Sequence, residues 1–243
     1  MDFQKLDNAV EDTFTALLYC PPGVGKSTAI GLISERLDGN TLVLDVDRTI
    51  TKTLNKHEIV QNTDKVYVTK IDNINTCEDW DRIISDLVEM KKSGKLDEMN
   101  IKCVAVDNIS ELERCFLSDM GSKGKNRGVP AMGDYQVMQF KLVNSLRKMK
   151  SLGINVVWTA WEDARQITMP DGTAYTQIIP KVSAKVVDNI CGLCDVVGKI
   201  FVNKDGEHGI LLEATQNIYA KNQIDSRKAC KVEDFVKFKR EDK

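Results

Sequence analysis

The sequence has almost no net charge and no long hydrophobic run. Its 34 basic and 36 acidic residues leave a formal charge of −2, so any contact with nucleic acid must come from a local basic patch and not from bulk charge. No apolar run approaches the length that crosses a bilayer, and residues 1–5 contain no apolar segment. These absences predict a cytoplasmic protein with no membrane partner.

A zinc-binding pattern is also lacking. Cys191 and Cys194 form one C-x-x-C pair, with no second pair and no nearby histidine, whereas a structural zinc site takes four ligands. The number of cysteines is odd, and most lie in apolar segments: Cys20, Cys77, Cys103, Cys115, Cys191, Cys194 and Cys230. We therefore predict buried free thiols in a reducing compartment.

The pattern of apolar residues predicts an α/β fold. Hydrophobic residues make up 42% of the chain and charged residues 29%, which is ordinary for a globular protein. Buried strands are predicted at 15–19, 41–45, 66–71, 101–106 and 154–160. One helix is predicted at 27–37, and a second begins with a capping box at 76–79. Two more helices are predicted at 135–152 and 183–193. This alternation predicts a mostly parallel sheet with helices on both faces.

The C-terminal third has a different pattern. Pro170-Asp-Gly172 and Lys204-Asp-Gly206 are typical of turns in antiparallel hairpins. No internal repeat or low-complexity linker divides the chain. We predict a single domain with its core at about 13–222 and a C-terminal tail at 223–243. In the helix 135–152, we expect Phe140, Val143, Leu146 and Met149 to face inward.

A phosphate-binding loop lies between the first strand and the first helix. Glycines let the backbone wrap around phosphates, and the N–H groups at the start of the helix point at the anion. Lys26 is expected between the β- and γ-phosphates of ATP, and the Ser27 hydroxyl is expected to ligate Mg²⁺. The predicted nucleotide-binding residues are Pro22, Gly23, Val24, Gly25, Lys26, Ser27 and Thr28. Cys20 stands where the usual pattern has its first glycine, and the alternative is a chance Gly-Lys-Ser sequence in a loop.

Carboxylates follow two of the predicted strands. Asp107 ends the strand at 101–106, where it can hold the Mg²⁺ hydration shell beside the phosphate loop; the alternative is an ordinary cap of the next helix. Asp45 and Asp47 end the second strand, two residues apart. Either one can position a water near the γ-phosphate, and the alternative is that both are exposed loop acids.

Two other segments are candidates for contacting nucleic acid or for sensing the γ-phosphate. Lys123, Lys125 and Arg127 lie in a glycine-rich segment, 121–133, which we predict to be a mobile loop able to contact a nucleic-acid backbone. The alternative is a solvated loop. Trp158 is expected in the core, whereas Trp161 and Glu162 are candidates for a γ-phosphate sensor or a stacking platform, with packing as the favoured alternative.

Taken in this order, the motifs resemble the RecA-like ATPase core. More closely, the chain resembles the phage nucleotide-binding ATPases that include single-strand annealing recombinases, over residues from about 15 to 222. The order of the motifs along the chain carries this resemblance. The phosphate loop comes first, followed by Asp45-Val-Asp47, the Asp107 strand, the basic loop, Gly133-Asp-Tyr135 and Val156-Val-Trp-Thr-Ala160.

The resemblance implies several roles. It places Asp47 where RecA-like enzymes carry a catalytic glutamate, so a shorter side chain and slow hydrolysis are expected. It makes 121–133 a first DNA-binding loop, and it makes the region after Trp161, with Arg165 and Lys181, a second one. Lys221, in Tyr219-Ala-Lys-Asn222, becomes a candidate to reach the ATP of a neighbouring subunit; the alternative is a surface lysine. RecA-like proteins usually carry a Gln or His that senses the γ-phosphate near the position of Trp161 or Glu162, and this sequence has neither residue there.

The sequence thus predicts an ATP- and Mg²⁺-dependent, DNA-binding ATPase of phage recombination or replication. The expected partners are single-stranded DNA, further copies of the chain in a ring or filament, and a single-strand DNA-binding protein. Three alternatives stay open: a helicase-loader-like module gated by ATP, a small-molecule kinase, and annealing without hydrolysis. Few arginines and a hairpin-rich C-terminal third disfavour the kinase, and about thirty residues after Ala214 are too few for a loader's helical domain.

Overall fold

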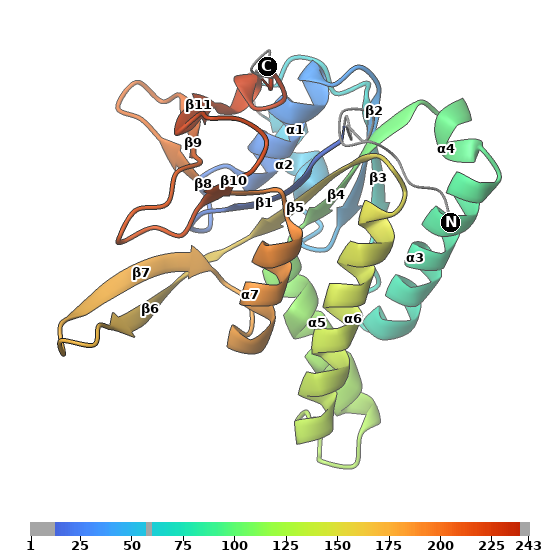
Figure 1. Ribbon diagram of the computed structural model, residues 1–243. Helices are drawn as coiled ribbons and strands as arrows, with labels where there is room; N and C mark the ends of the chain where they lie inside the picture. Colours follow the sequence, from blue (N-terminus) through green and yellow to red (C-terminus); the bar gives the residue numbers. More distant parts are fainter. Residues whose placement is uncertain (1–12, 57–59, 239–243) are drawn as a thin grey trace, which may run out of the picture.

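The computed structural model describes residues 13–56 and 60–238 as one α/β unit (Figure 1). Its strands are β1 (Thr15–Tyr19), β2 (Asn40–Asp45), β3 (Val66–Lys70), β4 (Ile101–Asp107), β5 (Asn155–Ala160), β6 (Glu162–Thr168), β7 (Ala174–Pro180), β8 (Val196–Val202), β9 (His208–Leu211), β10 (Lys221–Asn222) and β11 (Ala229–Lys231). Its helices are α1 (Lys26–Arg36), α2 (Ile50–Lys56), α3 (Thr76–Lys92), α4 (Lys95–Glu98), α5 (Ile109–Lys123), α6 (Met132–Lys150) and α7 (Ala184–Leu193), followed by a 3₁₀ turn at Val232–Asp234. The five strands and the α7 helix predicted from the sequence are confirmed to within two residues.

The central sheet places the chemistry-bearing strands close together. Its order is β11-β9-β8-β1-β5-β4-β2-β3, with β10 also paired to β8. The strands from β8 to β3 pair in parallel, whereas β9, β10 and β11 pair antiparallel. Only β5 separates the P-loop strand β1 from β4, which ends in Asp107. Because parallel strands end at one edge, the phosphate loop and Asp107 meet there.

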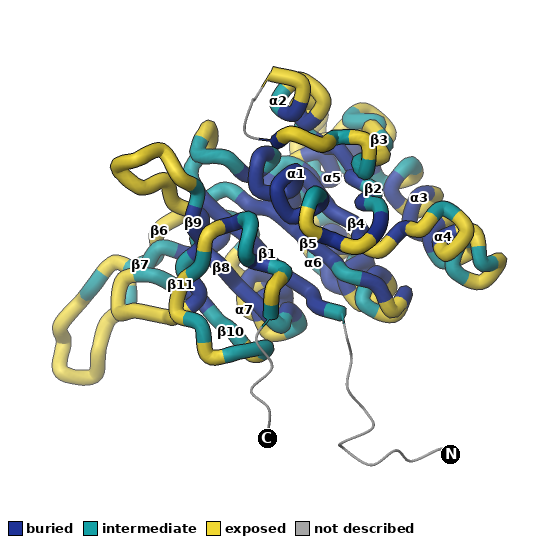
Figure 2. Tube along the Cα trace, turned by 90° about the horizontal axis from the view of Figure 1, so that it is seen from above, coloured by how far each residue is buried: buried dark blue, intermediate teal, exposed yellow. Residues whose placement is uncertain are grey.

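Side chains alternate between the two faces of this sheet. In β1, Leu17 and Tyr19 belong to a core shared with α3, α5, α6 and α7, whereas Ala16 and Leu18 belong to a core shared with α1 and α2. This is the period of two that a strand imposes on its side chains. In Figure 2 the buried residues lie along the central strands, and the hairpin tips are exposed.

The start of α3 differs from the prediction. The residue at the N-cap is Asn75, and Thr76 is already the first helical residue and is fully buried. Asp79 does not complete a capping box, because its carboxylate accepts a hydrogen bond from the Asp72 N–H at 2.9 Å. The helix predicted after 76–79 is confirmed, and Trp80, Ile83, Ile84 and Leu87 form its buried face.

The segment 121–133 is only partly a loop, which corrects the sequence-based prediction. α5 continues to Lys123 and α6 begins at Met132, so the two helices extend past the sheet as an antiparallel pair (Figure 1). The prediction that Phe140 faces inward was also wrong, because 69% of it is exposed. Val143, Leu146 and Met149 are buried as predicted. The buried face of α6 includes Met138 and Leu142 instead. Phe140 is nine residues from Met149, which is about two and a half helical turns, so the two side chains lie on opposite faces of the helix.

Both predicted hairpins are present. β6 and β7 form a separate two-stranded sheet, with Gly172 in its turn at φ 86°, and β8 and β9 are joined through Gly206 at φ 81°. Positive φ values of this kind explain the glycine at each turn. The β6–β7 hairpin projects from the body beside α7 (Figure 1).

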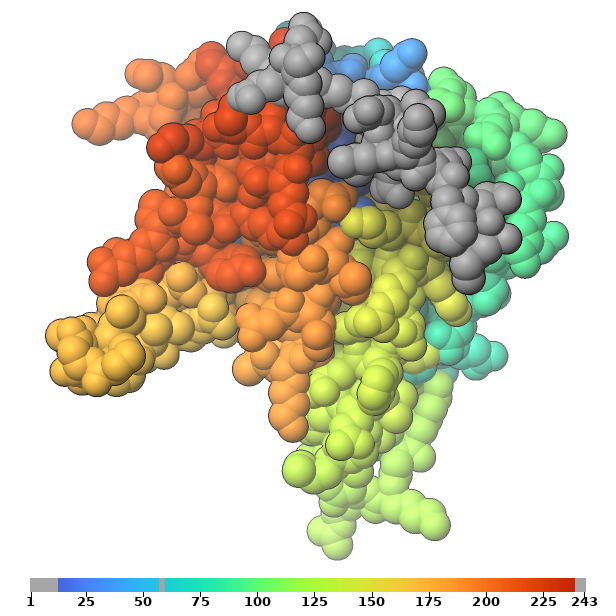
Figure 3. Space-filling view, viewed as in Figure 1, coloured from blue at the N-terminus to red at the C-terminus, as the bar shows by residue number. Residues whose placement is uncertain are grey.

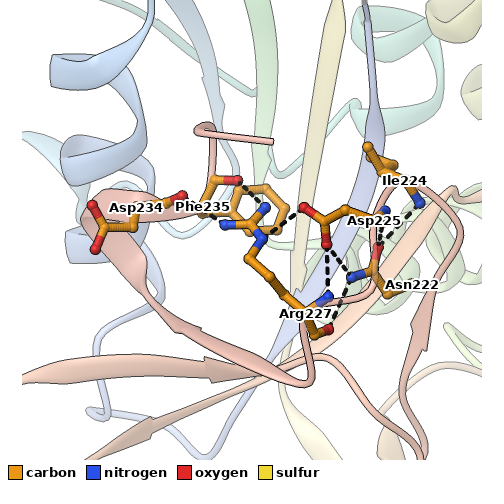
Figure 4. Close-up of polar contacts among 6 residues, drawn as sticks. All are labelled: Asn222, Ile224, Asp225, Arg227, Asp234 and Phe235. Carbon is orange, nitrogen blue, oxygen red and sulfur yellow. Dashed lines mark hydrogen bonds and ion pairs between the residues drawn. The ribbon is translucent and has the colours of Figure 1, made fainter. Parts of the chain in front are cut away.

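The segment after residue 222, predicted as a tail, is built into the core as far as the structure describes it. β11 joins the sheet, and Phe235 is fully buried with its ring 5.4 Å from that of Phe14. Arg227 fastens this segment (Figure 4): its guanidinium donates to the Asp225 carboxylate at 2.6 Å and to the carbonyl oxygens of Asp234 and Phe235 at 2.8 and 3.1 Å. Burial acts to raise the pKa of Asp225, but hydrogen bonds from Asn222 and Arg227 lower it overall.

Replacing Arg227 by Met is expected to lower the free energy of unfolding by about 3 kcal/mol, because the Asp225 carboxylate is then buried without its partner. Urea denaturation measures this change. The control is Arg36→Met, which removes an exposed ion pair with Glu233 and is expected to cost about 0.5 kcal/mol. Equal effects of the two changes would contradict the role given to Arg227.

Candidate nucleotide-binding site

The phosphate loop begins where β1 ends. Cys20 is fully buried, and its N–H donates to the Ala160 carbonyl of β5 at 3.3 Å. Gly23 and Gly25 have φ values of 81° and 115°, which only glycine adopts without strain. A small side chain at Cys20 therefore replaces the usual first glycine inside an intact strand, loop and helix arrangement.

His208 is a neighbour of the phosphate loop that no sequence motif predicts. A Cβ added at Gly25 would lie 2.4 Å from Cε1 of His208. The imidazole of β9 thus packs against the glycine that precedes Lys26. No local pattern signals this contact, because β9 reaches the loop only through the pairing of β8 with β1.

A cavity of about 340 Å³ lies over the loop. It is lined by Pro22, Gly23, Gly25, Lys26, Ser27, Thr28, Asp47, Thr49, Thr53 and Trp161. The structure therefore brings six of the seven predicted nucleotide-binding residues together with Asp47. Val24 is outside this lining and packs toward the core shared with α1. The Lys26 amine is 3.5 Å from the Pro21 carbonyl and lies within the loop.

Asp107 faces Ser27. The Ser27 hydroxyl donates to one Asp107 oxygen at 2.5 Å, and the Thr159 hydroxyl donates to the other at 2.7 Å. Burial raises the pKa of Asp107, while these two hydrogen bonds and the charge of Lys26 act in the opposite direction. The capping alternative is wrong, because the cap of α5 is Asn108, whose side chain accepts from the Glu111 N–H at 2.9 Å.

These residues fit a divalent cation that binds together with nucleotide. Ser27 and Asp107 offer oxygen ligands, which Mg²⁺ prefers, and Mg²⁺ is commonly held by one or two such groups plus phosphate oxygens. The buried Asp47 Oδ1 has no hydrogen-bond partner among the described residues, so an unsatisfied acceptor faces the same region. No group of three or more His, Cys, Asp or Glu side chains in the described chain could hold a metal without the nucleotide.

Asp45 and Asp47 have different surroundings. Asp45 accepts from the Thr49 N–H at 3.1 Å near the start of α2, and it is outside the cavity lining. Asp47 lines the cavity, and its Oδ2 accepts from the Asn108 amide at 2.6 Å. Burial, with the nearby carboxylates of Asp107 and Glu111, raises the pKa of Asp47 to about 7. Of the two carboxylates, only Asp47 is placed to act on a water inside the cavity.

Comparison with known proteins agrees with this geometry. The model of a family described as "AAA domain" matches residues 13–224. The chain belongs to the AAA domain family. No curated protein matches the sequence. The match and the phosphate loop together indicate an ATP-binding P-loop ATPase, built on a mostly parallel sheet flanked by helices.

Trp161 forms the wall of the nucleotide cavity of this AAA domain. Its backbone N–H donates to the Ser110 hydroxyl at 2.9 Å, and the Arg114 guanidinium lies 4.9 Å from the centroid of its ring. Glu162, the other sensor candidate, forms an ion pair with Lys199 of β8. Trp158 is buried in the core, as predicted.

The candidate DNA contacts of the AAA domain lie outside the nucleotide cavity. Lys123 is on α5 and pairs with Asp119 at 2.7 Å, whereas Lys125 and Arg127 are exposed in the α5–α6 connection. The Arg165 guanidinium binds the Gln177 side chain and Asp188. Their contacts with DNA stay predictions.

Lys221 is held within its own subunit. Its amine donates to the carbonyl oxygens of Cys191, Gly192 and Cys194 at 3.3, 3.1 and 2.6 Å, at the C-terminal end of α7. A cation at this end of a helix is favourable. The structure thus gives Lys221 a role in anchoring α7, and its action on a neighbouring subunit stays a prediction.

The described part of the chain contains no helix that is both long enough and apolar enough to span a membrane.

Proposed function

We propose that this AAA domain hydrolyses ATP with Mg²⁺ and couples the reaction to single-stranded DNA, as a homo-oligomer in phage recombination or replication. One observation carries the ATPase part of the proposal. The phosphate loop and Asp47 line one cavity, and Ser27 of that loop is hydrogen-bonded to Asp107.

The chain's own groups have separate tasks in the reaction. The loop N–H groups and the start of α1 bind the phosphates, and Lys26 compensates their charge. Asp47, held by Asn108, orients a water and accepts its proton as the water attacks the γ-phosphorus. When bound, Mg²⁺ held by Ser27 and Asp107 would neutralise charge on the phosphate oxygens.

Two projections support the DNA part of the proposal. The α5–α6 pair carries exposed Lys125 and Arg127 at its end. The β6–β7 hairpin projects in another direction, on the other side of α7 (Figure 1). Figure 3 shows both standing away from the body. Because the net charge is only −2, local cations of this kind must supply the attraction to phosphates.

Exposed apolar side chains on α6 support the proposal of a homo-oligomer. Val129, Met132, Val137 and Phe140 are 58%, 88%, 53% and 69% exposed. The last three lie within one helix, and Phe140 and Val137 are three residues apart on one face. Several exposed apolar side chains on one projecting helix are typical of a protein contact. The same patch also favours the alternative of an ATP-gated module that binds another protein.

Replacing Phe140 by Ser is expected to weaken self-association in the presence of ATP by about tenfold or more, as for a central interface residue. Stability of the monomer is expected to change little, because Phe140 is exposed. Analytical ultracentrifugation measures the assembly, with Ile74→Ser in the β3–α3 connection as an equally exposed control. A wild-type protein that stays monomeric with ATP would contradict the homo-oligomer and leave the partner-binding alternative.

The proposed function is tested by measuring phosphate release from ATP with and without an oligothymidylate. We expect Mg²⁺-dependent turnover that rises when the strand is added, together with direct binding of the strand. Turnover without any strand binding would support the ATPase and reject the role in DNA metabolism.

A further inference from the structure

The phosphate loop contains glycines that do not fix their own conformation. Gly23 and Gly25 both have positive φ values, and glycine has more backbone freedom to lose on ordering than any other residue. Gly25 is the N-cap of α1 and has no side chain with which to cap it. The turn of the loop is closed by a hydrogen bond from the Val24 N–H to the Pro21 carbonyl at 3.4 Å, which is long for such a bond. A neighbouring element must therefore help to hold this loop in a shape that meets phosphates.

His208 is such a neighbour. A Cβ added at Gly25 would lie 2.4 Å from Cε1 and 2.7 Å from Nδ1 of His208. The imidazole ring thus fills the space that a side chain at this position would occupy. Gly25 and Lys26 line the nucleotide cavity, whereas His208 is outside its lining. The ring therefore contacts the loop from outside the cavity, where it leaves room for the nucleotide.

The central sheet sets the position of this ring. His208 begins β9 opposite Val202 of β8, and β8 pairs with the P-loop strand β1. Ile210, two residues further along β9, packs in the core shared with α1, so His208 is on the same face of the sheet as α1. Glu207, the residue before it, forms an ion pair with Lys231 of β11 at 2.5 Å. The ring thus stands on a paired strand, which is a more rigid support than the glycine loop itself.

We propose that His208 is a positioning residue of the ATP site, whose ring holds Gly25 and the backbone N–H groups beside Lys26 in the arrangement that binds phosphates. The inference rests on the ATP-binding part of the proposed function and not on its DNA part. A loop that is already held loses less conformational freedom when phosphates bind, so its affinity is higher without any further contact to the nucleotide. The coupling is reciprocal, so bound nucleotide stabilises the β8–β9 hairpin.

The test uses the full chain and two variants of His208. His208→Ala removes the ring, and His208→Phe keeps a flat ring but removes the nitrogen atoms. The matched control is Phe201→Ala in the same hairpin. The Phe201 ring packs equally closely on Gly209 of β9, where an added Cβ would lie 2.5 Å from its Cζ. Because Gly209 is the residue next to His208, Phe201 covers the opposite face of the hairpin.

Three measurements are compared. Titration with a fluorescent ATP analogue, and its displacement by unlabelled ADP, gives the two nucleotide affinities. Phosphate release from ATP gives KM and kcat. Hydrogen exchange of residues 203–208, with and without ADP, reports on the hairpin itself. Thermal unfolding without nucleotide fixes a temperature at which every variant is folded.

We expect His208→Ala to weaken the binding of ATP and ADP by about fivefold, as when a loop must be ordered by the ligand instead of by the protein. Both nucleotides should lose equally, because both present the phosphates that the loop surrounds. KM should rise while kcat stays within about twofold, since the loop holds phosphates in the ground state and the transition state alike. His208→Phe should recover most of the affinity, because it restores the volume beside Gly25.

ADP should slow hydrogen exchange at 203–208 in the wild type and have a smaller effect in His208→Ala. Phe201→Ala should bind nucleotide like the wild type, although it removes a ring from the same hairpin. This comparison separates an effect on the phosphate loop from a general weakening of the hairpin.

Each contrary result has its own meaning. If the wild-type protein binds no nucleotide, the proposed function and this inference are both overturned. If the wild type binds nucleotide and His208→Ala binds it as tightly, the inference is overturned and the proposed function stands. An equal loss in Phe201→Ala, or a loss in His208→Phe as large as in His208→Ala, would also overturn it. The exchange measurement needs no variant: unchanged exchange at 203–208 when ADP binds to the wild type would exclude the coupling.

Discussion

Replacing Asp47 by Asn is expected to lower ATP turnover by about 10²–10⁴-fold, the range for losing a general base. Asp47 is the carboxylate in the lining of the nucleotide cavity, and Asn108 fixes its orientation at 2.6 Å. An amide of the same shape can still accept the Asn108 hydrogen bond but cannot take a proton from water. Nucleotide binding should therefore persist, as measured by titration with a fluorescent ATP analogue, while phosphate release is lost.

The matched control for this change is Asp45→Asn. Asp45 lies two residues away at the end of β2, but it accepts from the Thr49 N–H and is outside the cavity lining. We expect a reduced thermal stability and a turnover within a few-fold of the wild type. Equal losses of turnover in the two variants would show that the strand end, and not the Asp47 carboxylate, matters for the reaction.

Replacing Lys26 by Ala is expected to lower turnover by about 10²–10³-fold, as when one preorganised electrostatic contact to the transition state is removed. Unlike the Asp47 change, it should also weaken ATP binding, because Lys26 compensates phosphate charge in both the bound and the reacting state. Phosphate release and nucleotide titration together distinguish the two variants.

The folding control for Lys26→Ala is a comparison of thermal unfolding without nucleotide. Among the described residues the Lys26 amine makes one hydrogen bond, at 3.5 Å to the Pro21 carbonyl, and its charge also acts on the carboxylates of Asp107 and Asp47. We therefore expect its loss to lower the stability of the nucleotide-free protein without unfolding it, and the comparison rests on the change that ATP adds. Added ATP should raise the melting temperature of the wild type and have a smaller effect on the variant. An ATP-dependent rise of equal size in both would contradict the role of Lys26 in binding.

Patterns over neighbouring residues were enough to predict some of the molecule. The strand, glycine loop and helix from Thr15 to Arg36 follow from local signals, because apolar runs, positive φ at glycine and helix propensity act over a few residues. The periodicity of α3 and the turns at Gly172 and Gly206 are of the same kind. The prediction of Asp107 beside the phosphate loop also needed the general rule that parallel strands end at one edge.

One prediction failed because a spacing of three residues drifts around a helix. Phe140 and Met149 are about two and a half turns apart and so lie on opposite faces of α6, whose buried face includes Met138 and Leu142. Two others failed because a local pattern does not show what packs against a segment. The glycine-rich segment after Gly121 is helical to Lys123, because α5 continues to pack on α6. The predicted tail from residue 223 is core, because Phe235 meets Phe14 from the far end of the chain.

The sequence by itself determined the phosphate loop, the α/β class and the acidic strand ends, since these depend on contacts between neighbouring residues. Only the tertiary structure decided that Asp47 and not Asp45 lines the nucleotide cavity. It also decided that His208 lies against Gly25 and that Lys221 caps the C-terminal end of α7. It also created a second cavity of about 450 Å³, from residues 110–114, 163–165 and 179–187. The physical reason is that strand order brings distant segments together, and the order depends on the packing of the whole sheet and not on any one segment.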